Sequence, residues 1–211
     1  MQEVRVLEKR RIFDDIFAID EAVVSFRRPD GAWSGPVRRL SFERGDSVAA
    51  LLVNRATGRL VLVDQFRYPT WEKGPGRLRE IVAGGLEEGE TPEAAVRREV
   101  REETGHDPVT LHPILTFYVS PGGSSERILL YYGELDAPEL SASVESRGES
   151  GRPERDVGGP GIGGRGVGDE DIRVVERAAE ELWQDLAAGR LQDAKTIIAL
   201  LWLRTRDPGP V

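Results

Sequence analysis

A chain of 211 residues with 39% hydrophobic and 31% charged residues has the size and composition of a globular protein with one domain, or one domain and a small second one. It contains no cysteine, which excludes a disulfide framework, a thiolate nucleophile and a zinc–thiolate site. The net charge of −8 argues against a nucleic-acid-binding protein, and the longest fully apolar run, residues 197–203, is too short to cross a bilayer. The expected location is the cytoplasm.

Short strands are predicted over most of the first 45 residues, because runs of β-branched and apolar residues recur there without a helical period. A turn signal at residues 29–31 separates two of these runs, which lie at residues 4–7, 12–19, 22–26 and 37–42. A few strands without a helix bury little surface by themselves. We therefore expect a small N-terminal β domain, residues 1–45, that packs on the rest of the chain or on a second subunit.

Two strongly apolar runs follow this region. Residues 48–53 and 59–66 flank a turn signal at residues 54–58, which predicts two buried neighbouring strands joined by a hairpin. A polar loop at residues 68–76 then leads into the apolar segment LREIVAG at residues 78–84.

The stretch GGLEEGETPEAAVRREVREETGH, residues 84–106, predicts an acidic loop followed by a helix. Thr91 suits the N-cap, Pro92 suits the first helical position, and Gly105 supplies a left-handed stop. The helix should therefore run from about residue 92 to residue 104.

Three glutamates share one face of this helix. Glu99, Glu102 and Glu103 lie at positions i, i+3 and i+4, where like charges near a helix C-terminus are unfavourable by ~0.3–1 kcal/mol each. A hard divalent cation that takes oxygen ligands would compensate for this repulsion. The alternative is a solvated charged face, partly neutralised by the arginines of the same helix, Arg97, Arg98 and Arg101.

Seven residues and one apolar position of this stretch follow a fixed spacing. They fit the pattern Gly-x5-Glu-x7-Arg-Glu-U-x-Glu-Glu-x-Gly-U, in which U is apolar, through Gly84, Glu90, Arg98, Glu99, Val100, Glu102, Glu103 and Gly105. The pattern resembles the Nudix box, the signature of the Nudix hydrolases. His106 departs from the final apolar position, which affects a packing contact and leaves the chemistry untouched.

After the helix at residues 92–104, the sequence predicts strands first and helices last. Strands are expected at residues 109–117 and 127–135 and, after a long loop, at residues 172–176. A helix is expected at residues 178–188, and Asp193 suits the N-cap of a final helix. This order of elements predicts an α+β fold in which the box helix packs on a mixed sheet.

A glycine-rich segment, residues 148–168, lies within a flexible loop at about residues 142–168 and shows no period of 2 or 3.6 residues. We interpret it as either a tolerated insertion or a functional lid, since extending a surface loop costs little free energy. The acidic run at residues 169–171 slightly favours a function.

Further segments resemble the ADP-ribose pyrophosphatase branch of the Nudix hydrolases over nearly the full chain. They are VRRLSFERG (37–45), DQFRYP (64–69), EIVAGGLEEGE (80–90), SPGGSSER (120–127), EDIRV (170–174) and DAKTIIALLWL (193–203). The resemblance implies a hydrolase domain at residues 46–211 with an α/β/α sandwich around the mixed sheet. It also implies a homodimer in which the N-terminal β domain completes the active site of the partner.

The resemblance further implies a divalent cation, Mg²⁺ or alternatively Mn²⁺, bound by oxygen ligands. The implied metal ligands are the backbone carbonyl of Ala83 and the side chains of Glu99, Glu102 and Glu103. Arg98 is expected to orient the glutamates and Glu90 to support the loop, so Arg98, Glu102 and Glu103 also belong to the expected catalytic set.

An acidic residue before the late strand is implied as the general base that takes a proton from water. Glu170 is the preferred candidate, and Asp169 and Glu126 stay open, because the position that is commonly acidic in the family falls at Gly168 in this alignment.

Substrate binding is assigned by resemblance to Arg39, Arg67, Glu126 and Gly84. A guanidinium group suits bidentate contact with phosphate, although a surface salt bridge is the alternative role for either arginine. Leu40 stands where some relatives carry a glutamate that recognises the base, so the preference for adenine is open.

The function implied by the resemblance is Mg²⁺-dependent hydrolysis of the diphosphate of ADP-ribose to AMP and ribose 5-phosphate. The nearest alternative is the same reaction on another nucleoside diphosphate sugar, such as GDP-mannose or ADP-glucose. A catalytically silent ADP-ribose sensor is the alternative from another class, and the intact set of Glu99, Glu102 and Glu103 argues against it. No nucleic acid or membrane partner is expected.

Overall fold

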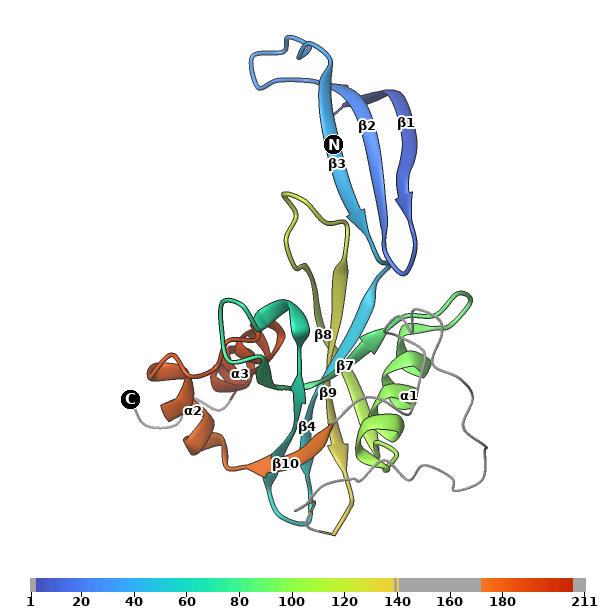
Figure 1. Cartoon of the computed structure of the whole chain (residues 1–211). Helices are drawn as coiled ribbons and strands as arrows, with labels where there is room; N and C mark the ends of the chain where they lie inside the picture. The colour runs from blue at the N-terminus through green and yellow to red at the C-terminus, as the bar shows by residue number, and fades with distance from the viewer. Residues whose placement is uncertain (1–2, 139, 141–171, 207–211) are drawn as a thin grey trace. The chain divides into compact units, whose positions relative to one another are not determined.

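A computed structural model describes residues 3–138, 140 and 172–206 (Figure 1). The chain divides into two units. Unit 1 comprises Met1–Asp46 and Tyr118–Arg127, and unit 2 comprises Ser47–Phe117 and Ile128–Val211. The glycine-rich segment at residues 148–168 lies outside the described residues, as do the two base candidates that follow it, Asp169 and Glu170.

Unit 1 contains a three-stranded antiparallel sheet in the order β1–β2–β3. Its strands are β1 (Val4–Asp14), β2 (Ala18–Phe26) and β3 (Val37–Glu43). The prediction of four shorter strands was wrong at residues 15–17, where a turn forms in which Asp15 N donates to Phe17 O at 3.0 Å. The turn predicted at residues 29–31 is confirmed, since Ala32 N donates to Asp30 Oδ1 at 2.9 Å.

Strand β1 is continuous where the sequence predicted a gap between two short strands, because its charged side chains pair with side chains of β2. Arg10 Nε donates to Glu21 Oε1 at 2.8 Å, and Arg11 Nε donates to Asp20 Oδ1 at 2.9 Å. Such cross-strand pairs stabilise a sheet without any apolar alternation. Every residue of β1 is nevertheless exposed, including the large apolar side chains of Val4, Val6, Leu7, Ile12 and Phe13.

Unit 2 is built on a mixed sheet with the strand order β10–β5–β4–β9–β8. The central strand β4 (Ser47–Asn54) runs antiparallel to β5 (Arg59–Phe66) and parallel to β9 (Arg127–Leu135). The predicted β4–β5 hairpin is confirmed, since Gly58 N donates to Asn54 O at 2.7 Å. The other strands are β6 (Arg77–Glu80), β7 (Val82–Gly85), β8 (Thr110–Tyr118) and β10 (Arg173–Arg177).

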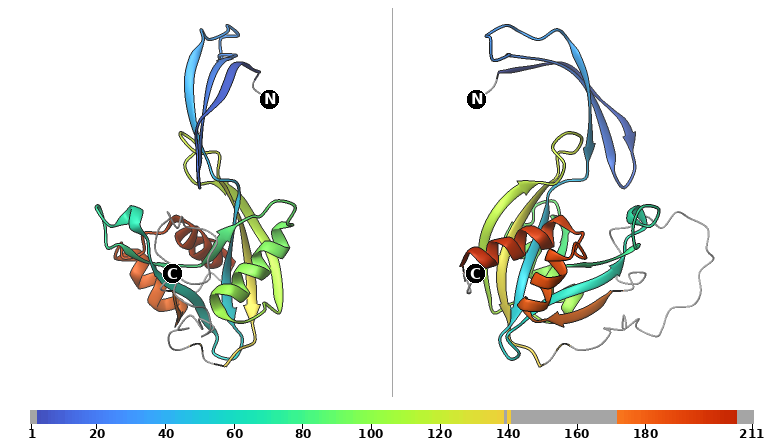
Figure 2. Two further views of the ribbon diagram at one scale, coloured as in Figure 1. Left: turned by 45° about the vertical axis from the view of Figure 1, so that its right-hand side comes forward. Right: turned by 90° about the vertical axis from the view of Figure 1, so that its left-hand side faces the viewer.

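Helices cover both faces of this sheet, as Figures 1 and 2 show. Helix α1 (Pro92–Thr104) lies on one face, and helices α2 (Ala179–Ala187) and α3 (Ala194–Arg206) lie on the other. A short 3₁₀ helix, η1 (Tyr68–Thr70), follows β5. The predicted mixed α+β fold is therefore confirmed.

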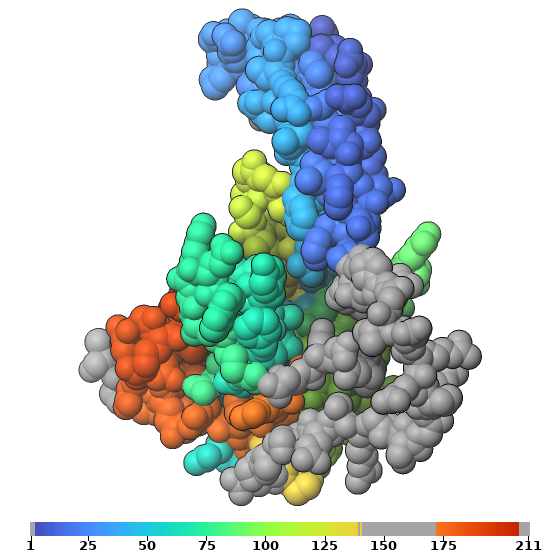
Figure 3. All heavy atoms as spheres, in the orientation of Figure 1, coloured from blue at the N-terminus to red at the C-terminus, as the bar shows by residue number. Residues whose placement is uncertain are grey.

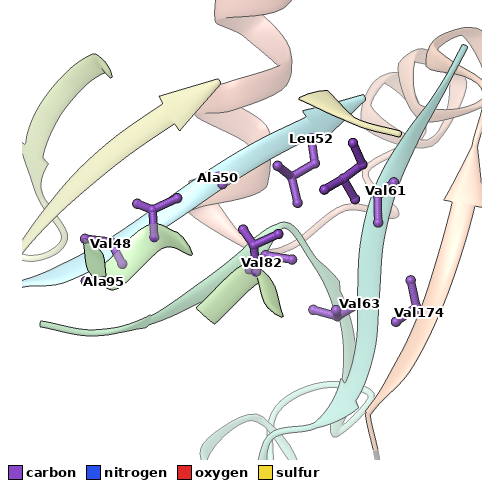
Figure 4. Packing of buried hydrophobic residues seen from close by; sticks show 11 residues of the cluster. Val48, Ala50, Leu52, Val61, Val63, Val82, Ala95 and Val174 are labelled. Carbon is purple, nitrogen blue, oxygen red and sulfur yellow. The ribbon is translucent and has the colours of Figure 1, made fainter. Parts of the chain in front are cut away.

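The side chains of β4 alternate between the two layers of the core. Val48, Ala50 and Leu52 pack in the cluster that includes the buried face of α1 (Figure 4). Ala49 and Leu51 pack in the cluster that includes α2 and α3. Because both faces are covered, each fully buried leucine or valine side chain contributes about 1.5–3 kcal/mol to folding. This double burial explains why β4 has a continuous apolar sequence.

Among the described helices, none combines the length and the hydropathy that a membrane crossing requires.

Candidate active site

The two ends of α1 are set by local interactions that the sequence predicted. Thr91 Oγ1 accepts a hydrogen bond from Ala94 N at 3.3 Å, and Pro92 is the first helical residue. Gly105 adopts a φ of 76°, and its N–H donates to Arg101 O at 2.9 Å. Helix α1 therefore has the predicted bounds, and its last two turns carry the three glutamates.

Arg98 is the hydrogen-bonding centre of this helix face. Its Nε and Nη2 donate to the two carboxylate oxygens of Glu90 at 3.1 Å and 3.0 Å. Its Nη1 donates to Glu99 Oε1 at 2.7 Å and to Glu102 Oε2 at 3.2 Å, while Nη2 also donates to Gly85 O at 3.0 Å. One cation therefore offsets part of the repulsion between the glutamates, and Glu90 fixes that cation in place. The hydrogen bond from Arg98 lowers the pKa of Glu90.

The Glu99 carboxylate packs directly against the backbone at Gly84. A Cβ added to Gly84 would lie 1.9 Å from Glu99 Cδ, so no other residue type fits there without moving the carboxylate. The Glu99 side chain is only 13% exposed. Burial raises the pKa of the Glu99 carboxyl, and the contact with Arg98 offsets this effect only in part.

The other two glutamates differ in exposure. Glu103 is buried at 9% exposure, whereas the Glu102 side chain is 43% exposed. Ala83, whose carbonyl is a predicted ligand, is held in β7 by pairing with Ala49 of β4. All of these groups offer hard oxygen donors, which fit a divalent cation such as Mg²⁺. Within the described residues, no three acidic or histidine side chains are already arranged as a metal-binding group, so the metal assignment stays a prediction.

A second charged cluster in unit 2 holds Arg67, which follows β5. Arg67 Nε donates to Glu80 Oε1 at 2.8 Å, and its Nη2 donates to Glu80 Oε2 at 3.3 Å. The backbone N–H of Arg67 donates to Gly76 O at 2.6 Å. Lys195 Nζ in turn donates to Glu80 Oε2 at 3.1 Å and to Asp193 Oδ1 at 2.6 Å. Arg67, a predicted substrate-binding residue, is thus held by a buried carboxylate.

Neither Glu80 nor Lys195 was predicted from the sequence as a member of this cluster. A charged residue inside the apolar segment LREIVAG was the one available signal for Glu80. Lys195 gave none, because it reaches Glu80 across 115 positions of the chain.

The other predicted residues that the structure describes, Arg39 and Glu126, lie in unit 1. Arg39 is exposed on β3, where its Nη1 donates to Arg38 O at 3.0 Å. Leu40, beside it, is 46% exposed. Glu126 is buried at 9% exposure, and its Oε1 lies 3.5 Å from Arg44 Nε. The structure thus brings the α1 glutamates together with Arg98 and Gly84, while Arg39 and Glu126 belong to the other unit.

Comparisons with known proteins place the same segments in a family context. A family model described as "NUDIX domain" matches residues 43–151. The ADP-ribose pyrophosphatase of Escherichia coli strain K12 is 32% identical over 203 residues, which cover 96% of this chain and 88% of that protein. The GDP-mannose pyrophosphatase of Pectobacterium atrosepticum is 34% identical over 199 residues, which cover 93% and 92%. The GDP-mannose pyrophosphatase of Cronobacter sakazakii is 32% identical, with 96% of each chain covered. The similarity therefore extends over both units.

Proposed function

The chain belongs to the Nudix family of hydrolases, and on this premise we propose that it hydrolyses the diphosphate of ADP-ribose to AMP and ribose 5-phosphate. In this reaction a water oxygen forms a bond to one phosphorus, the bond from that phosphorus to the bridging oxygen breaks, and a carboxylate takes the proton of the water. The observation that carries the proposal is the group of charged residues on α1 (the α1 cluster), in which Glu99 accepts a hydrogen bond from Arg98 and its carboxylate packs against Gly84. Relatives named for this activity support the choice of substrate.

Nudix hydrolases generally use divalent metal ions, and we assign Mg²⁺ to the α1 glutamates, with Mn²⁺ as the alternative. Glu99, Glu102, Glu103 and the carbonyl of Ala83 would hold it. When bound, the cation neutralises phosphoryl oxygens and makes water more acidic. Arg98 donates a hydrogen bond to the Glu99 carboxylate, and Glu90 holds Arg98 through two further hydrogen bonds, so that the orientation of this one proposed ligand is restricted before the substrate arrives.

Two arginines are proposed to bind the diphosphate, Arg67 and Arg39. Arg67 donates two hydrogen bonds to the two carboxylate oxygens of Glu80, an arrangement that we call a fork. The fork fixes the plane of the guanidinium, which reduces the conformational entropy lost when Arg67 binds phosphate. Glu170 is the proposed general base, with Asp169 and Glu126 as alternatives, and Gly84 and Glu126 complete the proposed site. The expected cytoplasmic location stays a prediction.

We also propose that residues 1–45 mediate a homodimer and that each N-terminal domain contributes to the partner's active site. The supporting observation is β1, all of whose residues are exposed within this chain. Val6 is 59% exposed and Phe13 is 52% exposed, so contact with a second copy would remove apolar surface from water.

GDP-mannose is the second candidate substrate, because relatives with that name match this chain at 34% and 32% identity. ADP-glucose would undergo the same chemistry. A silent ADP-ribose sensor is the third candidate, and it would retain binding without turnover.

The test is product analysis on a panel of ADP-ribose, ADP-glucose and GDP-mannose with Mg²⁺, with the Glu99→Gln variant as the inactive control. Release of AMP and ribose 5-phosphate at the highest kcat/KM of the panel supports the proposal. Faster release of GMP and mannose 1-phosphate would assign the chain to GDP-mannose instead. Binding of ADP-ribose with no product would identify a sensor.

A further inference from the structure

We propose that Lys195 is a positioning residue for Arg67 and that it acts through Glu80. The proposal rests on the proposed function, in which Arg67 binds the diphosphate of the substrate. Lys195 lies in the first turn of α3, on an element that neither the box nor the predicted substrate site includes.

The four charged groups form a row of alternating sign. Arg67 contacts both oxygens of Glu80, Lys195 Nζ shares Glu80 Oε2 with Arg67 at 3.1 Å, and Asp193 Oδ1 accepts from the same Nζ at 2.6 Å. The row is charge-balanced, which a buried set of ions requires. Each inner member is fixed by the neighbour on either side.

The members of the row differ in exposure, and Arg67 is the most exposed of the four. The Glu80 side chain is 3% exposed, the Asp193 side chain 9%, the Lys195 side chain 19% and the Arg67 side chain 36%. Lys195 is therefore enclosed and acts on its neighbours, whereas Arg67 is the member most open to solvent. A substrate would meet Arg67, and the three enclosed groups would determine where its guanidinium lies.

The first turn of α3 is itself fixed to the strands that carry the site. Asp193 caps the helix, since Thr196 N donates to Asp193 Oδ2 at 2.9 Å, which confirms the predicted cap. The Thr196 hydroxyl accepts from Ile81 N at 2.9 Å, between β6 and β7. In the space-filling view the segment around β5 and β6 (teal) lies directly beside α2 and α3 (orange to red) (Figure 3). Lys195 is therefore presented to Glu80 by a rigid helix start.

Lys195 remains charged wherever the enzyme would be assayed. Burial lowers the pKa of Lys195, but the charges of Asp193 and Glu80 outweigh burial, and the net effect is a pKa above the ordinary 10.5. A raised pKa means that its contribution to stability is fully present below pH 10.5 and is lost only as the pH rises through the folded-state value. The positioning effect should thus be constant near neutral pH.

A simple structural ion pair would also explain these contacts, and the two roles differ in what they predict for kinetics. A structural role lowers the melting temperature and leaves KM unchanged in folded protein. A positioning role raises KM for the diphosphate substrate and requires Arg67 to be present.

The experiment is a double-mutant cycle on the full chain with Arg67→Ala, Lys195→Met and the double variant, with KM and kcat measured for ADP-ribose and Mg²⁺. We expect Lys195→Met to raise KM about tenfold while kcat falls by less than about threefold, as the loss of one charge-assisted contact to a binding group predicts. In the Arg67→Ala background, Lys195→Met should add nothing. Lys195→Arg should restore KM to within about threefold of the wild type, since it keeps the charge.

Control variants distinguish a failure of the Lys195 proposal from a failure of the proposed function. Arg190→Met removes a cation from an exposed ion pair with Asp185 and should leave KM unchanged. If Lys195→Met does not fold, Lys195→Gln takes its place under the same criteria. An unchanged KM in a folded Lys195 variant, or effects that multiply in the double variant, would overturn the role of Lys195 while the proposed function stands. If the wild type hydrolyses another sugar of the panel, the same cycle is run on that sugar. Absence of turnover on all of them would overturn the proposed function itself.

Discussion

Unit 2 holds two arginines in forks with glutamates, and the forks differ in how the chain builds them. Arg98 and Glu90 are eight residues apart within one loop and helix. Arg67 and Glu80 lie on neighbouring segments, and Glu80 also accepts a hydrogen bond from Lys195, 115 residues further along the chain. The first fork orients the expected metal ligands and the second an expected phosphate ligand. A local motif therefore arranges the expected metal ligands, whereas the surroundings of the expected phosphate ligand come from parts of the chain that are distant in sequence.

The largest effect should come from the glutamates of the proposed metal site on α1. Glu103→Gln removes a charge from the proposed metal site at a buried position and should lower kcat by at least about a hundredfold without unfolding the protein. The measurement is kcat with saturating Mg²⁺, beside the control Glu93→Gln at the exposed start of α1. Near-normal activity of Glu103→Gln would contradict the assignment of the metal site to α1.

Gly84→Ala should have a comparable effect, since its methyl group would occupy the place of the Glu99 carboxylate. We expect kcat to fall about a hundredfold, as for loss of a ligand, with a melting temperature within a few degrees of the wild type. The matched control is Gly85→Ala, whose added Cβ meets nothing within 4 Å. Equal activity of the two variants would show that the Glu99 position is not restricted by Gly84.

The dimer proposal concerns unit 1 and is tested on exposed apolar residues of β1. Val6→Asp combined with Phe13→Asp should convert a dimer into a monomer and reduce activity at least about tenfold, because charges oppose burial of that surface. Light scattering after size-exclusion chromatography gives the mass, and Glu8→Gln on the same strand is the control. A fully active monomer would refute the shared active site.

Breaking the Arg98–Glu90 fork and breaking the Arg67–Glu80 fork should change different kinetic constants. Glu90→Gln should lower kcat about tenfold with little change in KM, whereas Glu80→Gln should raise KM by a similar factor, because the first pair is proposed to orient metal ligands and the second to position a substrate-binding arginine. Steady-state kinetics on both variants decide this comparison. A KM effect for Glu90→Gln equal to that for Glu80→Gln would remove the distinction.

The smallest effect concerns stability at the two helix starts. Thr91→Ala should reduce the free energy of unfolding by about 1 kcal/mol, the usual cost of losing an N-cap. Asp193→Ala should cost more, about 2–3 kcal/mol, since Asp193 also pairs with the partly buried Lys195. Urea denaturation of the two variants at pH 7 gives both values, and a smaller cost for Asp193→Ala would contradict the account of the α3 start.

What could be predicted from the sequence follows the same division between local and long-range interactions. Helix α1 was predicted with its bounds because Thr91, Pro92 and Gly105 act on their immediate neighbours. Strand β1 was broken into two in the prediction because its charged residues hide the strand pattern, and their partners on β2 were not visible. The role of Lys195 could not be predicted, since nothing in the sequence pairs it with Glu80.

The central claim is that the α1 cluster hydrolyses a nucleoside diphosphate sugar. The most direct measurement is mass analysis of the products formed from ADP-ribose and Mg²⁺ in ¹⁸O-labelled water, with wild type and Glu103→Gln side by side. The account predicts AMP and ribose 5-phosphate from the wild type, with one labelled oxygen in one of the two products and almost none formed by the variant. A folded wild type that binds ADP-ribose and releases neither product would contradict it.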